Sequence, residues 1–182
     1  SSFATKEMHR LGHKHVQTVH GPIDDSSFFK LSSGEKTKLR ETFGIPQNSF
    51  IIGFVFRNQL RKSVPNLLEG FSLFKRNNPS VQNPKLLLHT SFSEGWNIHR
   101  LAAEYKIPIE DILTTYVCRA CNKFEVKPFT GEEQTCKFCG SQKAQITTGG
   151  GRGVSEKQLN EVYNLMDVYC HPFTSGGQEI PI

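Results

Sequence analysis

The sequence has 182 residues, of which 36% are hydrophobic and 21% charged, with a mean hydropathy of −0.42. This length suits one domain with at most a small appendage, and the composition excludes a disordered chain because it can bury a core. No apolar run approaches the roughly 18 residues that a membrane span needs, and the first residues lack a signal-peptide pattern. The sequence therefore predicts a cytoplasmic protein without a transmembrane segment, and peripheral attachment to a membrane surface stays open.

Basic residues exceed acidic ones by a modest margin. The 22 Lys and Arg residues against 17 Asp and Glu give a net charge of +5 and a pI near 9.0. This balance suits an anionic ligand, a nucleic acid or an anionic membrane surface without choosing among them. The sequence starts at Ser1 without a Met and stops at Ile182 without a finished helix or polar tail. We therefore expect it to be a piece of a longer chain.

The first expected elements are a strand and a helix. His15–Val19 is a short β-like run, and Gly21 and the proline after it close the run with a turn. Ser32 and Glu35 have the spacing of a capping box, which predicts a helix start. Gly44 stands where a left-handed residue would end that helix.

The middle of the chain alternates strands and helices. Residues 50–56 are almost continuously apolar, which predicts a central parallel strand covered on both faces. The next helix carries apolar residues on one face and has Pro65 in its first turn, where proline is tolerated. Its apolar positions are Val64, Leu67, Leu68, Phe71 and Phe74.

This alternation continues to the end of the chain. We expect a strand at 85–89, a helix at 98–105 and a strand at 112–117. After an interruption, a helix at 155–166 leads to a strand that begins at 167. Strands that alternate with helices form parallel βαβ units. The predicted fold class is therefore α/β, a Rossmann-like parallel sheet flanked by helices.

Two CxxC pairs stand 14 residues apart in the interruption. Two such knuckles supply four thiolates for tetrahedral zinc, whereas disulfides fit a chain without a secretory signal poorly and a redox CxxC would explain only one pair. Gly140 relieves the backbone at the second knuckle, and the fifth cysteine, Cys170, is expected to be a buried thiol. The predicted zinc ligands are Cys118, Cys121, Cys136 and Cys139.

The zinc site should be structural, because four protein sulfurs leave no open position for water or substrate. We predict a zinc ribbon at 118–147, inserted into a Rossmann-like domain made of 1–117 and 148–182. Basic residues lie in the ribbon, but Glu125, Glu132 and Glu133 dilute their field. Nucleic acid is therefore a less favoured partner, and a zinc-ribbon module for nucleic acid or protein binding on a noncatalytic α/β scaffold stays as the alternative function.

Cations gather after the central strand. Arg57 follows that strand directly, and Arg61 and Lys62 come just before the next helix. Ligands of parallel sheets bind where loops and helix N-termini follow the strands, so these cations suit a diphosphate. A polar Gly-rich loop at 171–181, after the last expected strand, is a second candidate because glycines let backbone amides approach a ligand.

These motifs, in this order, resemble the C-terminal, nucleotide-sugar-binding half of GT-B glycosyltransferases, in particular the large retaining family called glycosyl transferases group 1. Phe54–Arg57 with Lys62 looks like the strand that the family follows with Arg and, five residues on, Lys. The helix at 159–167, His171-Pro172 and the loop at 174–181 look like the family's helix and Pro-Ser-x-x-Glu-Gly-Phe-Gly-x-Pro loop. The resemblance covers nearly the whole chain except 118–147.

The resemblance implies an enzyme that transfers a sugar, of hexosyltransferase type, from a nucleotide diphosphate sugar to an unknown acceptor. It implies that Arg57 and Lys62 hold the diphosphate and that Gly176 and Gly177 lie beside the donor sugar and phosphates. It also implies an N-terminal GT-B half as a partner, without which this fragment is inactive.

The chain departs from the family where the loop carries its Glu-x7-Glu motif. Gly176 aligns with the first Glu, and Glu179 comes three residues late. Glu179 is the candidate catalytic carboxylate, and its shifted position leaves a second reading open, a domain that binds nucleotide without catalysis.

Overall fold

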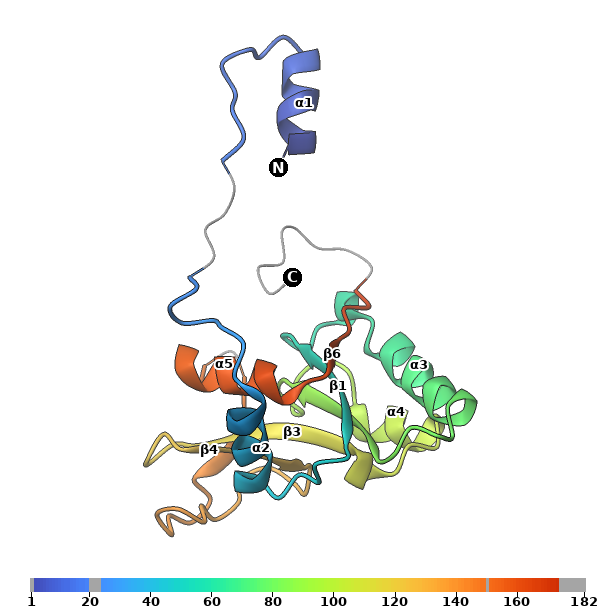
Figure 1. Cartoon of the computed structure of the whole chain (residues 1–182), viewed down its shortest axis with the longest axis vertical. Coiled ribbons are helices and arrows are strands. Elements are labelled where there is room, and N and C mark those ends of the chain that lie inside the picture. Colours follow the sequence, from blue (N-terminus) through green and yellow to red (C-terminus); the bar gives the residue numbers. More distant parts are fainter. Residues whose placement is uncertain (1, 20–23, 150, 174–182) are drawn as a thin grey trace.

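The computed structural model describes residues 2–19, 24–149 and 151–173 as a mixed α/β structure with one sheet (Figure 1). The strand order is β4-β3-β2-β1-β6, and β5 pairs with β3 off this path. The helices are α1 (Ser2–Arg10), α2 (Ser33–Thr42), α3 (Val64–Asn77), α4 (Ile98–Glu104) and α5 (Glu156–Leu165). The strands are β1 (Phe50–Val55), β2 (Pro84–His89), β3 (Ile112–Cys118), β4 (Phe124–Pro128), β5 (Gln145–Thr147) and β6 (Val168–Tyr169). Short 3-10 turns lie at Leu60–Lys62 and Ile109–Asp111.

The sheet is mostly parallel, as predicted. β1 pairs in parallel with β2 on one side and β6 on the other, and β2 pairs in parallel with β3. Helices α3 and α4 cover one face, while α2 and α5 cover the other (Figure 1). None of the helices in the described ranges is long and apolar enough to cross a membrane.

Alternate side chains of the strands enter two separate cores, as pleated strands require. Phe54, Leu86 and Leu88 pack under α3 and α4, whereas Ile51 and Leu87 pack under α2 and α5. All five are fully buried. The continuous apolar runs of β1 and β2 follow from this double coverage, because both faces of each strand lie in apolar surroundings.

The predicted helix boundaries are confirmed by capping geometry. The Ser32 side chain accepts a hydrogen bond from the Glu35 backbone amide, and the Ser32 backbone amide donates to the Glu35 carboxylate, which completes a capping box. Ser155 and Gln158 form the same kind of capping box at the start of α5. Gly44 follows α2 with a φ of +67°.

A glycine in β1 lets α5 approach the sheet closely. A Cβ at Gly53 would lie only 2.1 Å from the Met166 sulfur, so any side chain there would displace Met166. The end of α5 therefore lies directly against β1, and the next residues form β6 beside it.

Asp167 joins three elements at this point. Its carboxylate accepts the Ile51 amide of β1 at 2.8 Å, Arg40 of α2 at 2.8 Å and Lys36 of α2 at 2.7 Å. The Arg40 side chain is buried and also donates to the Leu165 carbonyl at 3.1 Å. Burial opposes the charge on Asp167, but these donors outweigh it and hold the pKa of the carboxyl below its ordinary value.

Strand β3 extends past the ends of its parallel neighbours. Its first residues pair with β2 as far as Thr114, and its last ones, Tyr116 to Cys118, pair with β5. β4 runs antiparallel to β3 along residues 113–117, so it occupies the opposite edge of β3 from both β2 and β5. β5 thus continues the path of β2 beyond the point where β2 ends.

Residues 118–147 therefore share the sheet with the rest of the chain. β4 also contributes Phe124 and Val126 to the core under α2 and α5, where Phe124 lies against Phe43 with ring centroids 5.1 Å apart. The division into a Rossmann-like domain and an inserted ribbon stays a prediction, but one sheet and one core connect the two parts.

The predicted strand at His15–Val19 is wrong. Residues 2–10 form α1, and the segment that follows is irregular and folds back on this helix. His9 Nε2 lies 2.7 Å from the Val16 carbonyl oxygen, and Thr18 donates to Thr5 at 2.7 Å. A strand needs a partner strand for its backbone groups. This segment instead forms hydrogen bonds with side chains of α1.

We predict that Asp167→Ala lowers the free energy of unfolding by about 2 to 3 kcal/mol, because it leaves the buried Arg40 guanidinium without its carboxylate. Urea unfolding measures this change. Glu41→Ala, an exposed position on α2, is the control and should change stability by less than about 0.5 kcal/mol. A loss below about 1 kcal/mol in Asp167→Ala would contradict the anchoring role.

Candidate metal centre and edge cavity

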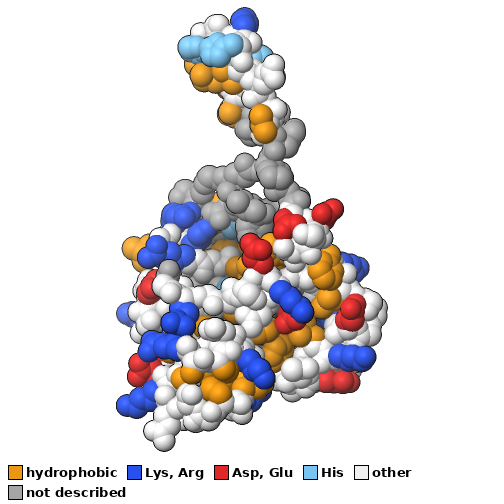
Figure 2. Space-filling view, turned by 90° about the vertical axis from the view of Figure 1, so that its left-hand side faces the viewer, with side chains coloured by type: hydrophobic (Ala, Val, Ile, Leu, Met, Phe, Trp, Pro, Cys, Tyr) orange, Lys and Arg blue, Asp and Glu red, His pale blue; other side chains and the backbone are white. Residues whose placement is uncertain are grey.

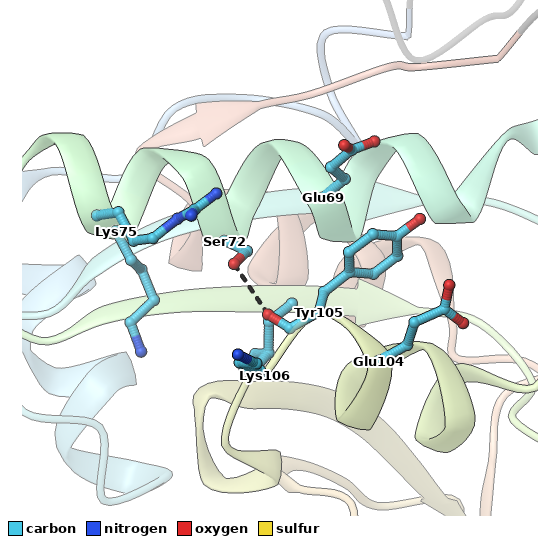
Figure 3. A pocket seen from close by; sticks show the side chains of 8 residues that line it. Glu69, Ser72, Lys75, Glu104, Tyr105 and Lys106 are labelled. Atoms are coloured by element: carbon cyan, nitrogen blue, oxygen red, sulfur yellow. Dashed lines mark hydrogen bonds between the residues drawn. The ribbon is translucent and has the colours of Figure 1, made fainter.

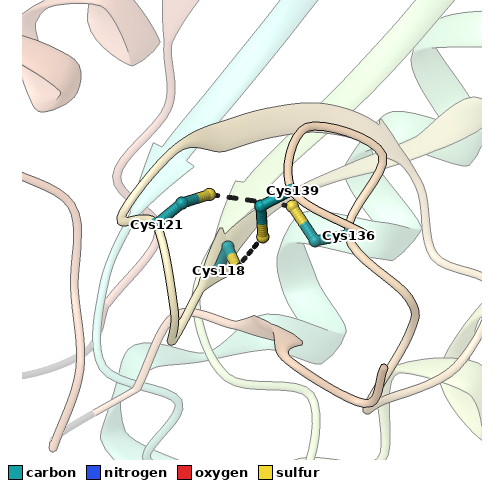
Figure 4. Close-up of side chains that lie close together, drawn as sticks. All are labelled: Cys118, Cys121, Cys136 and Cys139. Atoms are coloured by element: carbon teal, nitrogen blue, oxygen red, sulfur yellow. Dashed lines mark hydrogen bonds between the residues drawn. The ribbon is translucent and has the colours of Figure 1, made fainter. Parts of the chain in front are cut away.

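The four predicted zinc ligands lie together (Figure 4). The sulfurs of Cys118 and Cys139 are 3.7 Å apart, those of Cys121 and Cys136 are 3.8 Å apart, and all four lie within 4.8 Å of one another. Zn–S bonds of about 2.3 Å in a tetrahedron place sulfurs roughly 3.8 Å apart. These separations exceed the roughly 2.05 Å of a disulfide, so the cluster fits a metal and the cysteines are free thiols.

Backbone geometry supports this arrangement. The amides of Ala120 and Phe138 each point at the first sulfur of their knuckle, at 3.4 Å. Gly140 has a φ of +72°, which a residue with a side chain rarely adopts. Hydrogen bonds with Ser141 lower the pKa of the Cys139 thiol to about 6. Against the hydrogen bond from the Lys123 amide, burial and the neighbouring thiols raise the pKa of Cys121 to about 11. Cys139 therefore forms the thiolate that binds metal more readily than Cys121 does.

Charged residues surround the knuckles in neutralising pairs. Buried Glu125 forms ion pairs with Lys127 and, at 2.6 Å, with Lys137. Burial opposes its charge, yet the two lysines hold the pKa of the Glu125 carboxyl below its ordinary value. Figure 2 shows basic and acidic side chains interspersed over this side of the molecule.

A second feature lies at the carboxyl edge of the parallel strands, where the predicted cations were expected. A cavity of about 170 Å³ opens there among the residues that follow β1, β2 and β5. We call it the edge cavity; its lining residues are Phe56, Arg57, Asn58, His89, Thr90, Ser91, Glu94, Thr148, Gly149 and Gly153.

Asn58 shapes one wall of the edge cavity. Its side-chain NH₂ group donates to the backbone carbonyls of Ser91, Glu94 and Trp96, and its side-chain oxygen accepts the Trp96 backbone amide at 3.0 Å. Gly95 packs so close to Asn58 that a Cβ would lie 2.1 Å from the Asn58 carbonyl oxygen. The loop after β2 is therefore held in one conformation by a single buried side chain.

Two buried threonines line the edge cavity. Thr90 is 2% exposed and Thr148 is 4% exposed, and within the described part of the chain neither hydroxyl has a hydrogen-bond partner. An unpaired buried hydroxyl costs about 1 to 3 kcal/mol. A ligand that hydrogen-bonds these two groups would recover that free energy.

His89 is a neutral group beside them. Its Nδ1 lies 3.0 Å from the Thr115 hydroxyl, and burial lowers the pKa of His89 to about 4. The imidazole is therefore uncharged at neutral pH, when it can donate at one nitrogen and accept at the other.

The two predicted diphosphate cations take different positions. Arg57 lines the edge cavity; its side chain is 64% exposed, and its Nε lies 3.7 Å from the Glu94 carboxylate. Lys62 is buried, and its Nζ lies 5.0 Å from the centroid of the Phe173 ring. Phe173 in turn packs on His171, so Lys62 faces the segment that leaves β6.

Three predicted site residues, Gly176, Gly177 and Glu179, lie outside the described residues. Sequence reasoning missed Asn58, Thr90 and Thr148. Thr90 follows the predicted strand 85–89 directly, so its place after a strand was the available signal. Thr148 had none, because β5 was not predicted.

Other hollows lie near the edge cavity and away from it. One of about 510 Å³ adjoins the edge cavity, sharing Ser91, Glu94 and Gly149, and is bounded by Arg119 and Glu132 of the ribbon segment. Another of about 400 Å³ lies between α3 and the end of α4, where Ser72 donates to the Tyr105 carbonyl at 2.9 Å (Figure 3). None of the predicted site residues that the structure describes lines this last hollow.

A scan against models of known protein families finds no match to this sequence, and a search of curated proteins likewise finds no significant match. The functional assignment therefore depends on the chemistry of the two sites.

We predict that the chain binds one zinc ion and that Cys136→Ser loses it to a chelator that the wild type resists, because one of four thiolates is removed. Metal content by elemental analysis and the visible absorption of the cobalt form measure this. Cys170→Ser is the matched control, since Cys170 lies outside the cluster, and it should keep its metal. Equal metal loss from both variants would contradict the assignment.

The low pKa of His89 predicts a pH dependence of stability. The fold favours neutral imidazole, so its contribution is complete above an ordinary pKa of 6.5 and is lost as the pH falls toward about 4. Between about pH 7.5 and about pH 5 the wild type should lose about 2 kcal/mol of unfolding free energy through this group. Urea unfolding of His89→Gln should show a decline smaller by that amount, and an unchanged decline would assign it to other groups.

Proposed function

We propose that this chain is the nucleotide-sugar-binding half of a retaining GT-B glycosyltransferase and that the edge cavity with its neighbouring cations takes the donor. The observation that carries the proposal is the edge cavity itself, which is lined by Arg57 and by two buried threonines, Thr90 and Thr148, whose hydroxyls have no partner among the described residues. The cavity lies at the carboxyl edge of parallel strands, which is where ligands of such sheets bind.

Arg57 is well suited to a phosphate. Its contact with Glu94 joins two largely exposed side chains, and such pairs contribute only about 0 to 1 kcal/mol. A diphosphate with more charge and matching geometry would therefore displace Glu94 at little cost. Lys62 would supply a second cation from the start of α3, on the side of the segment that leaves β6.

In the proposed reaction the bond between the sugar and the diphosphate breaks, and the acceptor nucleophile bonds to the same sugar carbon. The nucleophile gives its proton to the leaving diphosphate, on which negative charge grows in the transition state. Fixed cations stabilise that charge more strongly in the transition state than in the bound donor, which lowers the barrier. Gly176, Gly177 and the candidate catalytic Glu179 belong to this site by resemblance. The acceptor would bind with the N-terminal half, and zinc held by four thiolates would stabilise the fold without entering the reaction.

The alternative function, nucleic-acid binding by the knuckles, has one observation in its favour. Lys123 and Lys137 flank the partly exposed ring of Phe138, at 5.3 and 5.1 Å from its centroid. Basic and aromatic side chains together bind single strands. However, Glu125 already pairs with Lys137, and the lysines lie over the ring that a base would need.

Titration calorimetry of the full chain with uridine, guanosine and adenosine diphosphates, and with short single-stranded oligonucleotides, tests both functions. We expect binding of at least one nucleoside diphosphate and no saturable binding of the oligonucleotides. Oligonucleotide binding without nucleoside diphosphate binding would favour the alternative.

Arg57→Ala should weaken nucleoside diphosphate binding at least tenfold, because a charge-assisted hydrogen bond contributes about 1.5 to 3 kcal/mol. Lys62→Met should do the same while it keeps most of the buried volume. Arg76→Ala is the matched control, since it removes the same charge from the far end of α3. If all three variants bind nucleoside diphosphate as tightly as the wild type, the diphosphate assignment is wrong.

A further inference from the structure

Glu132 connects the ribbon segment to the edge cavity. It lies between the two cysteine knuckles, and its carboxylate accepts the Thr147 amide at 3.1 Å and the Thr147 hydroxyl at 2.5 Å. Both oxygens of one carboxylate thus hold the residue directly before Thr148. Thr147 is 4% exposed and Glu132 is half-buried, so this pair of hydrogen bonds is partly shielded from water.

The loop that carries Glu132 is fixed at its other end by the cysteine cluster. Gln134 exchanges two backbone hydrogen bonds with Gln145, at 2.8 and 2.9 Å, and Cys136 follows two residues later. The side-chain amide of Gln134 also donates to the Tyr116 hydroxyl of β3 at 3.1 Å, and that hydroxyl donates to the Gly131 carbonyl. The loop therefore depends on β3 on one side and on the second knuckle on the other.

Thr147 also contacts the loop after β2. Its hydroxyl accepts the Phe92 amide at 3.4 Å while it donates to Glu132. Phe92 stacks on Phe129, with ring centroids 4.4 Å apart. The loop that leads to Cys136 is thus hydrogen-bonded to Gln145 through Gln134 and to Thr147 through Glu132, and Thr148 of the edge cavity follows directly.

We infer that Glu132 is a positioning residue that couples the cysteine cluster to the edge cavity, so that metal loading sets the affinity for nucleotide. This inference rests on the proposed function. A loaded cluster orders the loop at 130–134, Glu132 then fixes Thr147, and Thr148 and the glycine after it keep the cavity in its binding shape. Coupling between two sites is reciprocal, so nucleotide raises the affinity for metal by the same factor.

The test compares full chains with zinc bound and after removal of zinc by a chelator under reducing conditions. Calorimetry with the best nucleoside diphosphate gives the affinity of each form. We expect zinc removal to weaken binding between about five- and 150-fold, the usual range of such couplings. Restored zinc should restore the affinity.

Glu132→Gln separates coupling from simple structural support. This variant should keep one zinc, since it retains all four cysteines, yet its zinc-bound form should already bind nucleotide as weakly as the zinc-free wild type. Zinc removal should then change its affinity less than about twofold. Glu133→Gln is the matched control, because Glu133 is exposed and its carboxylate lies 3.9 Å from the Arg119 guanidinium, at the limit of an ion pair, and it should keep the full dependence on zinc.

Hydrogen exchange of the amides at 145–149 gives a readout that does not require nucleotide. It should accelerate in the zinc-free wild type and in zinc-bound Glu132→Gln, while amides of β1 and β2 stay protected. If no nucleoside diphosphate binds but exchange accelerates, Glu132 still couples the cysteine cluster to residues 145–149, and it is the proposed function that fails. An affinity indifferent to zinc, or exchange unchanged in Glu132→Gln, overturns the coupling.

Discussion

The structure depends on β3, which pairs with two different strands along one of its edges. β3 pairs with β2 through its first half and with β5 through its second, so the path that β2 leaves empty is filled by a strand from the far side of the cysteine segment. Backbone groups at the end of a buried strand must find partners, and every residue of β3 is buried. The cysteine segment is thereby joined to the sheet by main-chain hydrogen bonds, and its last residues lead to the carboxyl edge, where Thr148 and Thr90 both line the edge cavity.

Much of the fold was predictable because its signals are local. The apolar run at 50–56 and the capping boxes at Ser32 and Ser155 each reflect a force acting within a few residues, and the structure has the corresponding elements. The run at 15–19 has the same β-like composition, yet it lies against α1, since composition describes a strand's side chains and not the presence of a neighbour. β5 is only three residues long and carries too little pattern to be found.

The cysteine cluster and the edge cavity also differ in how far local sequence signals predict them. The cysteine cluster was predictable, because its spacing is a property of neighbouring residues. The edge cavity was only partly predictable. Arg57 could be found because it directly follows a predicted strand, but Asn58 shapes the cavity by hydrogen bonds to carbonyls more than 30 residues away in sequence. Such contacts arise from topology, which single residues do not encode. The same holds for Asp167, whose partners come from α2 and β1.

The pairing of β6 with β1 has a consequence for a chain that emerges from the ribosome in order. β1 gains β2 soon after synthesis, but its other edge is covered only when Val168 and Tyr169 arrive. Until then the nascent protein presents an apolar strand edge with unsatisfied amides, the kind of template on which chains associate wrongly. The brevity of β6 makes its docking depend on Asp167 and Met166, so these two residues also protect the edge of β1 from association with other chains.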